Sequence, residues 1–412
     1  MSNSVKKIYV SLEMSDNEIK LLIGEYFNTR FNIIKTLTSK TMAFNGFKIA
    51  DKELLVQDLK KVINEASTKL GAKIEKVILV LPTYNFKRFP LRSTVVPSTG
   101  VLKKEDVARA VSNSLHSNVD YDVMMVNTVI NKYTINGLAS RRLPENETCS
   151  DALIDLDLLC CDREMAYEYV DALESAGIKV LDICLNTYAI CKEASLIEES
   201  LKKNVILLDI GMQETFLTLL SKGRHLSTEV IFEGLNQMVD KVKSLYNIPY
   251  TDVVRMVKYS TNFNNEYLDN IIYSSNDTSI TLRDLNDAVK DSLNSFVDKL
   301  ITMCKPIIDQ GDTQIVIAGV GQSMKALLDC IRENSGVEVK DYYPDTIGIR
   351  DSSFTALYGS FVVYKEKEIL NNTSISCIDL FEYDDVIDHK KIDVEGESIT
   401  TKIKNLFIQY IN

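Results

Sequence analysis

The chain has 412 residues, 45% of them apolar and 25% charged, which is enough material for two or more domains with ordinary globular cores. Its formal net charge of -11 argues against general binding of nucleic acid, because proteins that bind phosphate backbones need a basic face to release counterions. The polar start does not have the pattern of a signal peptide, and no apolar run approaches the roughly 20 residues of a membrane-spanning helix. We therefore expect any membrane contact to be peripheral.

The cysteines and histidines do not indicate a metal site. Eight cysteines occur without a C-x-x-C pair, and the three histidines lie apart from them in the sequence. A zinc site would bring such residues together at short spacings. Several cysteines lie in apolar runs, so we expect buried free thiols in a reducing cytoplasm.

The first 83 residues have an α/β pattern. The expected elements are strands at 7–12, 18–26 and 31–36, a turn at 13–17, a helix at 51–70 and an apolar strand at 76–81. Two strands around a tight turn predict a hairpin, and apolar residues at helical spacing predict the helix. Sheet and helix together indicate a layered α/β domain.

The pattern changes after Pro82. Strands at 86–96, 121–133 and 150–161, a helix at 103–116 and a polar loop at 137–148 are expected there. We interpret 84–161 as a small inserted α+β domain. A helix at 162–176 and a strand at 178–185 then restore the α/β pattern, so 1–83 and 162–200 together are the first lobe.

The second half repeats the theme of the first. Strands are expected at 205–209, 215–220, 225–231 and 314–318, with helices at 236–245 and 323–332 and a mostly helical stretch at 251–309. This duplication predicts a second lobe at 201–365, with a helical subdomain at about 246–310. The fold class is therefore a two-lobed α/β fold with an inserted small domain.

The last part of the chain has a different composition. Acidic residues crowd 366–397, which predicts an acidic linker. Apolar residues then recur at helical spacing and predict an amphipathic helix over 398–412 that binds a membrane surface. The residues expected at the membrane are Ile399, Lys402, Ile403, Lys404, Leu406, Phe407, Tyr410 and Ile411. Folding of this helix back onto the protein is the alternative.

A strand that ends in Asp209-Ile210-Gly211 and is followed by a second apolar strand has the form of a phosphate loop. Sugar kinases, Hsp70 and actin-like proteins hold the phosphates and metal of a nucleotide with such an Asp and a tight Gly turn. Met212 and Gln213 stand where further glycines would let the backbone approach the phosphates closely. The loop therefore indicates ancestry more firmly than activity.

Four segments occur in an order that resembles the bacterial cell-division protein FtsA. They are Asp-Ile-Gly at 209–211, Glu-Gly-Leu-Asn at 233–236, Ala-Gly-Val-Gly at 318–321, and Tyr358-Gly359 followed by an expected apolar strand. The resemblance covers nearly the whole chain. It implies an actin-like fold, a duplicated ribonuclease H-like fold, in which the insertion replaces one actin subdomain.

The resemblance also implies partners and a ligand. Proteins of this family tether the tubulin-like protein FtsZ, through its C-terminal tail, to the inner face of the cell membrane at the division site. They assemble into filaments and bind ATP, with Mg²⁺, between the lobes. The nucleotide-binding residues that the resemblance implies here are Glu13, Ser15, Asp209, Gly211, Gln213, Thr215, Glu233, Gly234, Lys258, Gly319 and Gly321. Asp209 would hold Mg²⁺ through water, and an ordinary role at a strand end is its alternative.

The first loop departs from the family pattern. Glu13-Met14-Ser15-Asp16-Asn17 stands where the family has Asp-Ile-Gly-Thr-Thr, so Asp16 places a carboxylate where phosphate oxygens would lie. Two like charges a few ångströms apart in a partly desolvated cleft repel by roughly a few kcal/mol unless a cation bridges them. Both loops have thus lost parts of the cradle that a hydrolase needs.

We therefore expect a scaffold without catalytic residues, in which nucleotide binding is weak or lost. One alternative is a working ATPase whose loops are rebuilt by donors from Ser15, Gln213 and Thr215. Another is a pilus-assembly or chaperone-type relative of the same fold that binds a short partner peptide.

Overall fold

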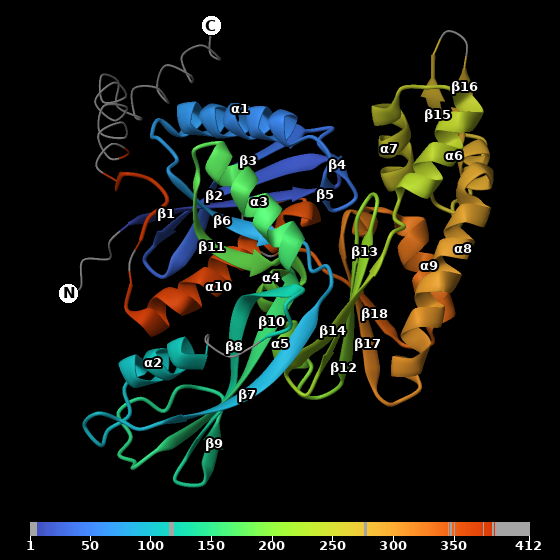
Figure 1. The fold of residues 1–412 in the computed structure, drawn as a ribbon. Helices are drawn as coiled ribbons and strands as arrows, with labels where there is room; N and C mark the ends of the chain where they lie inside the picture. The colour runs from blue at the N-terminus through green and yellow to red at the C-terminus, as the bar shows by residue number, and fades with distance from the viewer. Residues whose placement is uncertain are drawn as a thin grey trace, which may run out of the picture.

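The computed structural model describes residues 6–114, 119–275, 278–344, 346, 348–349, 351–373, 375–380 and 383. Three sheets of four or five strands organise these residues. Figure 1 shows the first and last of these sheets side by side as two lobes, with the inserted domain below the first lobe. The predicted membrane helix at 398–412 and most of the predicted acidic linker lie outside the described residues.

The first lobe is built on a five-stranded sheet of order β11-β6-β1-β2-β3. The elements of this lobe are β1 (Lys7–Ser15), β2 (Glu18–Phe27), β3 (Arg30–Lys40), the short strands β4 (Phe44–Asn45) and β5 (Lys48–Ile49), α1 (Lys52–Leu70), β6 (Lys76–Leu81), α3 (Arg163–Ser175), β11 (Lys179–Leu185), α4 (Asn186–Glu193) and α5 (Leu196–Glu199). β1 pairs antiparallel with β2 and parallel with β6. Helix α1 packs with α3, and α4 packs with a helix from the end of the chain, α10 (Thr355–Asn371).

Side chains at the helix ends explain why the predicted helix at 51–70 forms where it does. The side chain of Asp51 accepts a hydrogen bond from the backbone N–H of Leu54, and Gly71 ends the helix with a φ of 82°. An acidic N-cap and a left-handed glycine satisfy backbone groups that a helix leaves unpaired. The predictions for this helix and for the strand at 76–81 are confirmed.

The predicted turn at 13–17 is wrong. Strand β1 continues through Ser15, and the turn consists of only Asp16 and Asn17, whose φ angles are 52° and 58°. A two-residue hairpin turn of this kind needs positive φ at both positions, which Asp and Asn tolerate better than most residues. As a result Glu13 lies within the ladder opposite Lys20, and Asp16 lies at the hairpin tip.

The inserted domain is a four-stranded antiparallel sheet of order β7-β10-β8-β9 with one helix. Its elements are β7 (Lys87–Val95), α2 (Lys104–Ser114), β8 (Val123–Ile135), β9 (Leu138–Ser140) and β10 (Ala152–Asp162). The expected polar loop at 137–148 contains β9, which pairs with the end of β8.

The inserted domain contacts the second lobe through polar and aromatic side chains. Asp157 on β10 forms an ion pair with Arg224 at 3.2 Å, and Phe86 stacks on His225 with ring centroids 4.5 Å apart. Arg224 and His225 both lie on β14 (Arg224–Ile231). The inserted domain therefore bridges the two lobes.

The second lobe repeats the sheet of the first, with order β14-β13-β12-β17-β18. Its elements are β12 (Asn204–Ile210), β13 (Thr215–Ser221), β14, α6 (Asn236–Tyr246), α7 (Tyr250–Tyr259), β15 (Ile271–Ser274), β16 (Ser279–Thr281), α8 (Leu282–Ile308), β17 (Thr313–Gly319), the short helix η1 (Val320–Ser323), α9 (Lys325–Ser335) and β18 (Glu338–Asp341). In both lobes an antiparallel three-stranded unit is followed by two parallel strands. The predicted duplication and fold class are confirmed.

The strand expected after Tyr358-Gly359 is wrong, because these residues lie in α10. The run is apolar on all sides, and such a run does not distinguish a buried helix from a buried strand. Helix α10 extends beyond the expected lobe boundary at 365 and packs on the first lobe. The chain stays on that lobe after the helix, since the N–H of Cys377 donates to the carbonyl of Ile8 at 2.9 Å.

Two other expectations concern burial and the membrane. All eight cysteines are buried free thiols, as expected. Among the described residues, no helix is both long and apolar enough to cross a membrane.

Candidate functional site

A cleft between the lobes contains two adjoining hollows. The inner hollow encloses about 510 Å³, its open mouth included, and is lined by Glu13, Ser15, Asp16, Lys20, Pro82, Asn186, Ile190, Asp209, Gly211, Glu214, Phe216, Gly319, Val320, Ser352, Ser353 and Ala356. The outer hollow encloses about 1340 Å³ in the same sense and is lined by Asp16, Asn17, Glu18, Thr38, Lys40, Thr41, Met42, Met212, Gln213, Asn236, Tyr250, Thr251, Val254, Lys258, Val320, Asp351 and Ser353. Asp16 lines both hollows.

The loop that joins β12 to β13 forms one wall of the inner hollow. Its backbone is tight, because the N–H of Gly211 donates to the carbonyl of Glu214 at 2.9 Å. A Cβ atom on Gly211 would lie 2.7 Å from the Asp16 carboxylate and 2.8 Å from the Glu214 carbonyl. Glycine at this position therefore permits the close approach of the two hairpins.

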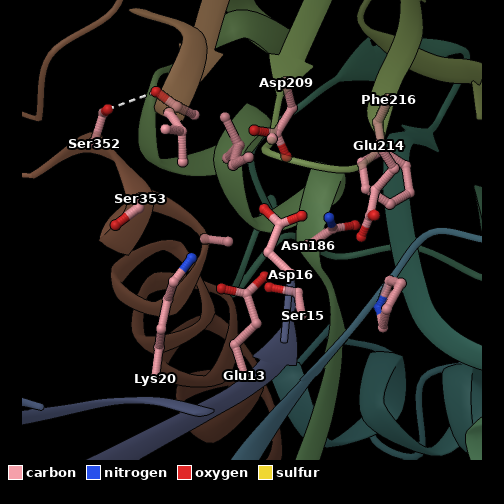
Figure 2. A pocket seen from close by; sticks show the side chains of 16 residues that line it. Glu13, Ser15, Asp16, Lys20, Asn186, Asp209, Glu214, Phe216, Ser352 and Ser353 are labelled. Atoms are coloured by element: carbon pink, nitrogen blue, oxygen red, sulfur yellow. Dashed lines mark hydrogen bonds between the residues drawn. The ribbon is translucent and has the colours of Figure 1, made fainter. Parts of the chain in front are cut away.

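The carboxylate of Asp16 binds this loop directly. Its Oδ2 accepts from the backbone N–H of Met212 at 3.0 Å, and its Oδ1 accepts from that of Gln213 at 3.0 Å. Figure 2 shows Asp16 reaching from the first hairpin into the inner hollow, where Asp209 and Glu214 converge from the second lobe. Two successive N–H groups that a phosphate would need thus have an acceptor from the chain itself.

Buried charge in the inner hollow is mostly negative. Burial, with a smaller contribution from nearby carboxylates such as Asp16 and Asp209, raises the pKa of Glu214 to about 8 and that of Glu13 to about 7. Burial also raises the pKa of Asp209 to about 6, with a further contribution from Asp16. These carboxyl groups therefore take up protons well above the usual pH.

Lys20 is the cation that faces these carboxylates. It is buried and lies opposite Glu13 in the hairpin ladder. Burial alone would lower its pKa, but attraction to Glu13, Asp16 and Glu18 outweighs burial and raises it. One buried ammonium compensates only part of the negative charge, so the hollow remains unfavourable for an added anion.

The late glycine turn completes the wall of the cleft. Gly319 ends β17 with a φ of 77°, which favours glycine, and a Cβ atom there would clash with the Asp209 carboxylate. The hydroxyl of Ser352 donates to the Gly319 carbonyl at 2.7 Å, drawn as the dashed line in Figure 2. The turn is thereby tied to the segment that leads into α10.

Seven of the eleven nucleotide-binding residues expected from the sequence line one of the two hollows. Five line the inner hollow, namely Glu13, Ser15, Asp209, Gly211 and Gly319. Gln213 and Lys258 line the outer hollow.

The other four residues are placed behind the walls and not in the lining of either hollow, as far as the described residues show. The hydroxyl of Thr215 donates to the Glu233 carbonyl at 2.8 Å, and the Glu233 carboxylate pairs with Lys299. Gly234 and Gly321 permit close packing, since a Cβ atom on either would lie about 2.5 to 2.6 Å from backbone or side-chain atoms at positions 211 and 210. These contacts support the loop from behind.

Several lining residues were missed by reasoning from sequence. Lys20 could have been found from the hairpin register, which pairs it with Glu13 once the turn is placed at Asp16 and Asn17. Tyr250 at the outer hollow carries no local signal. The Lys40 ammonium lies 5.3 Å from the centroid of the Tyr250 ring. The Tyr250 hydroxyl donates to the side-chain oxygen of Asn236 at 3.0 Å.

The residues present do not fit the phosphates of a nucleotide. The Asp16 carboxylate occupies the N–H pair of the second loop, and further carboxylates surround it. Within the described part of the chain, no group of three or more His, Cys, Asp or Glu is arranged to hold a metal ion.

Comparisons with known proteins find similarity to bacterial cell-division proteins. No family model matches the chain. It is 21% identical to the cell division protein FtsA of Enterococcus hirae, over 97% of this chain and 98% of that protein. It is also 21% identical to FtsA of Staphylococcus epidermidis, over 95% of this chain and 86% of that protein.

Solved structures show the same fold. A PilM-PilN type IV pilus biogenesis complex aligns with a TM-score of 0.58 at 15% identity, over 86% of this chain and 98% of that one. MreB5 of Spiroplasma citri bound to ADP aligns with a TM-score of 0.52 at 13% identity, over 89% of this chain and 99% of that one. The two-lobed architecture is therefore the actin-like fold.

Proposed function

As the chain is a divergent FtsA-like protein with the actin-like fold, we propose that it serves in cell division as a scaffold that tethers FtsZ filaments to the inner face of the cytoplasmic membrane and assembles into filaments. The observation that carries this proposal is the similarity to FtsA over 97% of this chain and 98% of the relative. A protein that shared only the fold with FtsA would not need to match it from end to end in sequence.

Binding of the FtsZ C-terminal tail is the first test. Co-sedimentation of the full chain with FtsZ filaments is expected to depend on that tail and to be lost when the tail is deleted. Absence of binding to the tail peptide at high micromolar concentration would contradict the proposal. That outcome would favour a pilus-assembly or chaperone-type role with a different peptide.

Membrane attachment is assigned to the predicted helix at 398–412. Each apolar side chain that is fully buried contributes about 1.5 to 3 kcal/mol, which ordering of the helix partly offsets. Attachment of one subunit is therefore weak, and a filament multiplies it by avidity. The full chain has a net charge of -11, and the predicted acidic linker keeps the folded body away from an anionic surface.

Pelleting with anionic vesicles tests this assignment. The full chain is expected to pellet, whereas a chain that ends at Asp393 and the full chain with Phe407→Asp are expected to stay in the supernatant. Asn405→Asp adds the same charge on the opposite face of the predicted helix and serves as the control. Equal pelleting of all four proteins would remove the anchor from the proposal.

Nucleotide binding is proposed to be weak or lost, because Asp16 accepts from the N–H groups at which phosphate oxygens would bind. Calorimetry with ATP, with and without Mg²⁺, is expected to show no micromolar binding. Micromolar affinity would overturn this part and favour a working ATPase with rebuilt loops. The tethering role would remain, because it depends on FtsZ and the membrane.

A further inference from the structure

We propose that the carboxylate of Asp16 is a built-in substitute for a bound phosphate, which holds the cleft between the lobes closed without a nucleotide. We call the contact of this carboxylate with the N–H groups of Met212 and Gln213 the Asp16 latch. The latch is independent of the tethering role and of any partner.

The geometry of the latch is that of an anion in a backbone cradle. Each carboxylate oxygen accepts from a different N–H group, and both distances are 3.0 Å. Successive N–H groups in a turn form a concave site for anions, and hydrogen bonds to a charged acceptor are stronger than neutral ones. An aspartate side chain thus satisfies donors that would otherwise need an external anion or water.

The second lobe holds these donors in place from behind. The N–H of Leu235 donates to the Gly211 carbonyl at 3.2 Å, and the N–H of Asn236 donates to the Met212 carbonyl at 2.8 Å. A Cβ atom on Gly234 would lie 2.5 Å from the first carbonyl and 2.7 Å from the second, so only glycine fits there. Because the carbonyls are fixed on one side, the N–H groups are presented on the other, toward Asp16.

The first lobe in turn fixes the position of the Asp16 backbone. Asp16 and its neighbour Asn17 form the complete two-residue turn of a hairpin whose strands pair without interruption from Lys7 to Ser15. The backbone that carries the carboxylate is therefore fixed. The absence of a side chain on Gly211 leaves room for it, since a Cβ atom would lie 2.7 Å from Oδ2.

The latch joins the two lobes. Asp16 belongs to the hairpin β1–β2 of the first lobe, and Met212 and Gln213 belong to the hairpin β12–β13 of the second. A second contact crosses the cleft at the outer hollow, where the Lys40 ammonium of β3 lies 5.3 Å from the centroid of the Tyr250 ring on α7. All five residues of these two contacts line the outer hollow, and both contacts favour closure.

An intramolecular acid has an advantage over a phosphate from solution. Its effective concentration is set by the fold and does not fall on dilution. It also adds negative charge beside Glu13, Asp209 and Glu214, which line the same hollow. An incoming phosphate therefore meets occupied donors and repulsion together.

The test measures the distance between the lobes in the full chain. Fluorophores on cysteines introduced at Glu53→Cys in α1 and Leu245→Cys in α6 report this distance by energy transfer, because both sites are exposed and all eight native cysteines are buried. Three further variants are compared in this labelled background, namely Asp16→Ala, Asp16→Asn and Glu18→Gln. Glu18 lines the outer hollow on the same hairpin, so Glu18→Gln removes one negative charge without removing a latch contact.

Asp16→Ala is expected to shift the distribution toward longer distances and to speed amide hydrogen exchange at Met212 and Gln213 at least tenfold. Asp16→Asn, which keeps the shape and one acceptor oxygen, is expected to lie between it and the parent. Glu18→Gln is expected to match the parent. Addition of millimolar inorganic phosphate is expected to restore the short distance in Asp16→Ala and to leave the parent unchanged.

Two outcomes would overturn the latch. Unchanged distance and exchange in both Asp16 variants would show that the cleft closes without the carboxylate. An equal response of Glu18→Gln would show that total charge matters and not the contact. If Asp16→Ala does not fold, Asp16→Asn carries the same comparison. None of these measurements involves FtsZ or membrane, so the tethering proposal stands or falls separately.

Discussion

The two hairpins that face each other across the cleft are equivalent parts of a duplicated fold, yet they differ at their tips. The first, β1–β2, turns in two residues and presents the Asp16 side chain. The second, β12–β13, turns through residues 211–214 and presents backbone N–H groups. One tip is therefore an anion and the other an anion receptor. Two equivalent loops of a duplicated fold can therefore become partners for each other.

A larger side chain at the tip of β12–β13 is expected to disrupt the contact between the two hairpins most strongly. Gly211→Val is expected to lower the free energy of unfolding by about 2 to 4 kcal/mol, because the new side chain would overlap the Asp16 carboxylate and the Glu214 carbonyl. Denaturation in urea measures the loss. Gly100→Ala is the control, since open space surrounds Gly100 and only its positive φ of 71° is strained. A loss at Gly211 no larger than at Gly100 would contradict the close approach.

Removal of the anion is expected to have a smaller effect. Asp16→Ala loses two hydrogen bonds to a charged acceptor, worth about 1.5 to 3 kcal/mol each, but relieves repulsion among the buried carboxylates. A net loss of about 1 to 3 kcal/mol follows, measured by the same urea titration. In calorimetry the variant is expected to bind ATP more tightly than the parent protein. Equal stability and unchanged affinity would show that the two tips are not coupled.

The raised pKa of Glu214, about 8, predicts a dependence of stability on pH. The folded state holds the proton more tightly than the unfolded state, where the pKa is near 4.5, so stability falls as pH rises from about 5 to 8. Glu214→Gln is expected to be more stable than the parent by about 1 to 2 kcal/mol at pH 8 and equal to it at pH 5. Glu229→Gln, which changes an exposed carboxylate on β14, is expected to keep the parental slope. A parental slope in Glu214→Gln would contradict the assignment.

The outer contact between Lys40 and Tyr250 is expected to contribute least. Cation–π pairs at accessible sites are worth about 0.5 to 1 kcal/mol. A double-mutant cycle with Lys40→Gln and Tyr250→Leu is expected to give a coupling of this size in the free energy of unfolding. Tyr250→Phe keeps the ring and is expected to keep the coupling, which separates the ring from its hydroxyl. A coupling near zero would show that this pair does not help to hold the lobes together.

Much of the fold could be predicted from the sequence, because local patterns decide it. The helix at 51–70 follows from its apolar period, its Asp51 cap and Gly71. The strand expected after Gly359 failed because an apolar run without period fits a helix as well as a strand, and packing of α10 against α4 decided between them. The expected turn at 13–17 is too long, since Glu13 and Ser15 continue the strand although both are polar.

In the candidate site too, some residues can be predicted from local sequence patterns and others cannot. Asp209, Gly211 and Gly319 stand out in the sequence as residues at strand ends, and the fold brings all three to the inner hollow. Thr215 and Glu233 had similar local signals but contact each other behind the loop. Lys20 and Glu214 have no motif. Their role depends on burial beside other charges, which is a property of the assembled cleft.

The duplicated α/β architecture, the inserted domain and the altered phosphate loops can be inferred from the amino-acid sequence, because strand and helix periods and turn residues are local properties. The contact between the altered loops depends on the assembly of the two lobes. Asp16 and the N–H groups of Met212 and Gln213 are nearly 200 residues apart in sequence. Their contact exists because two separate sheets meet across one cleft, and no local pattern encodes the distance between the two tips.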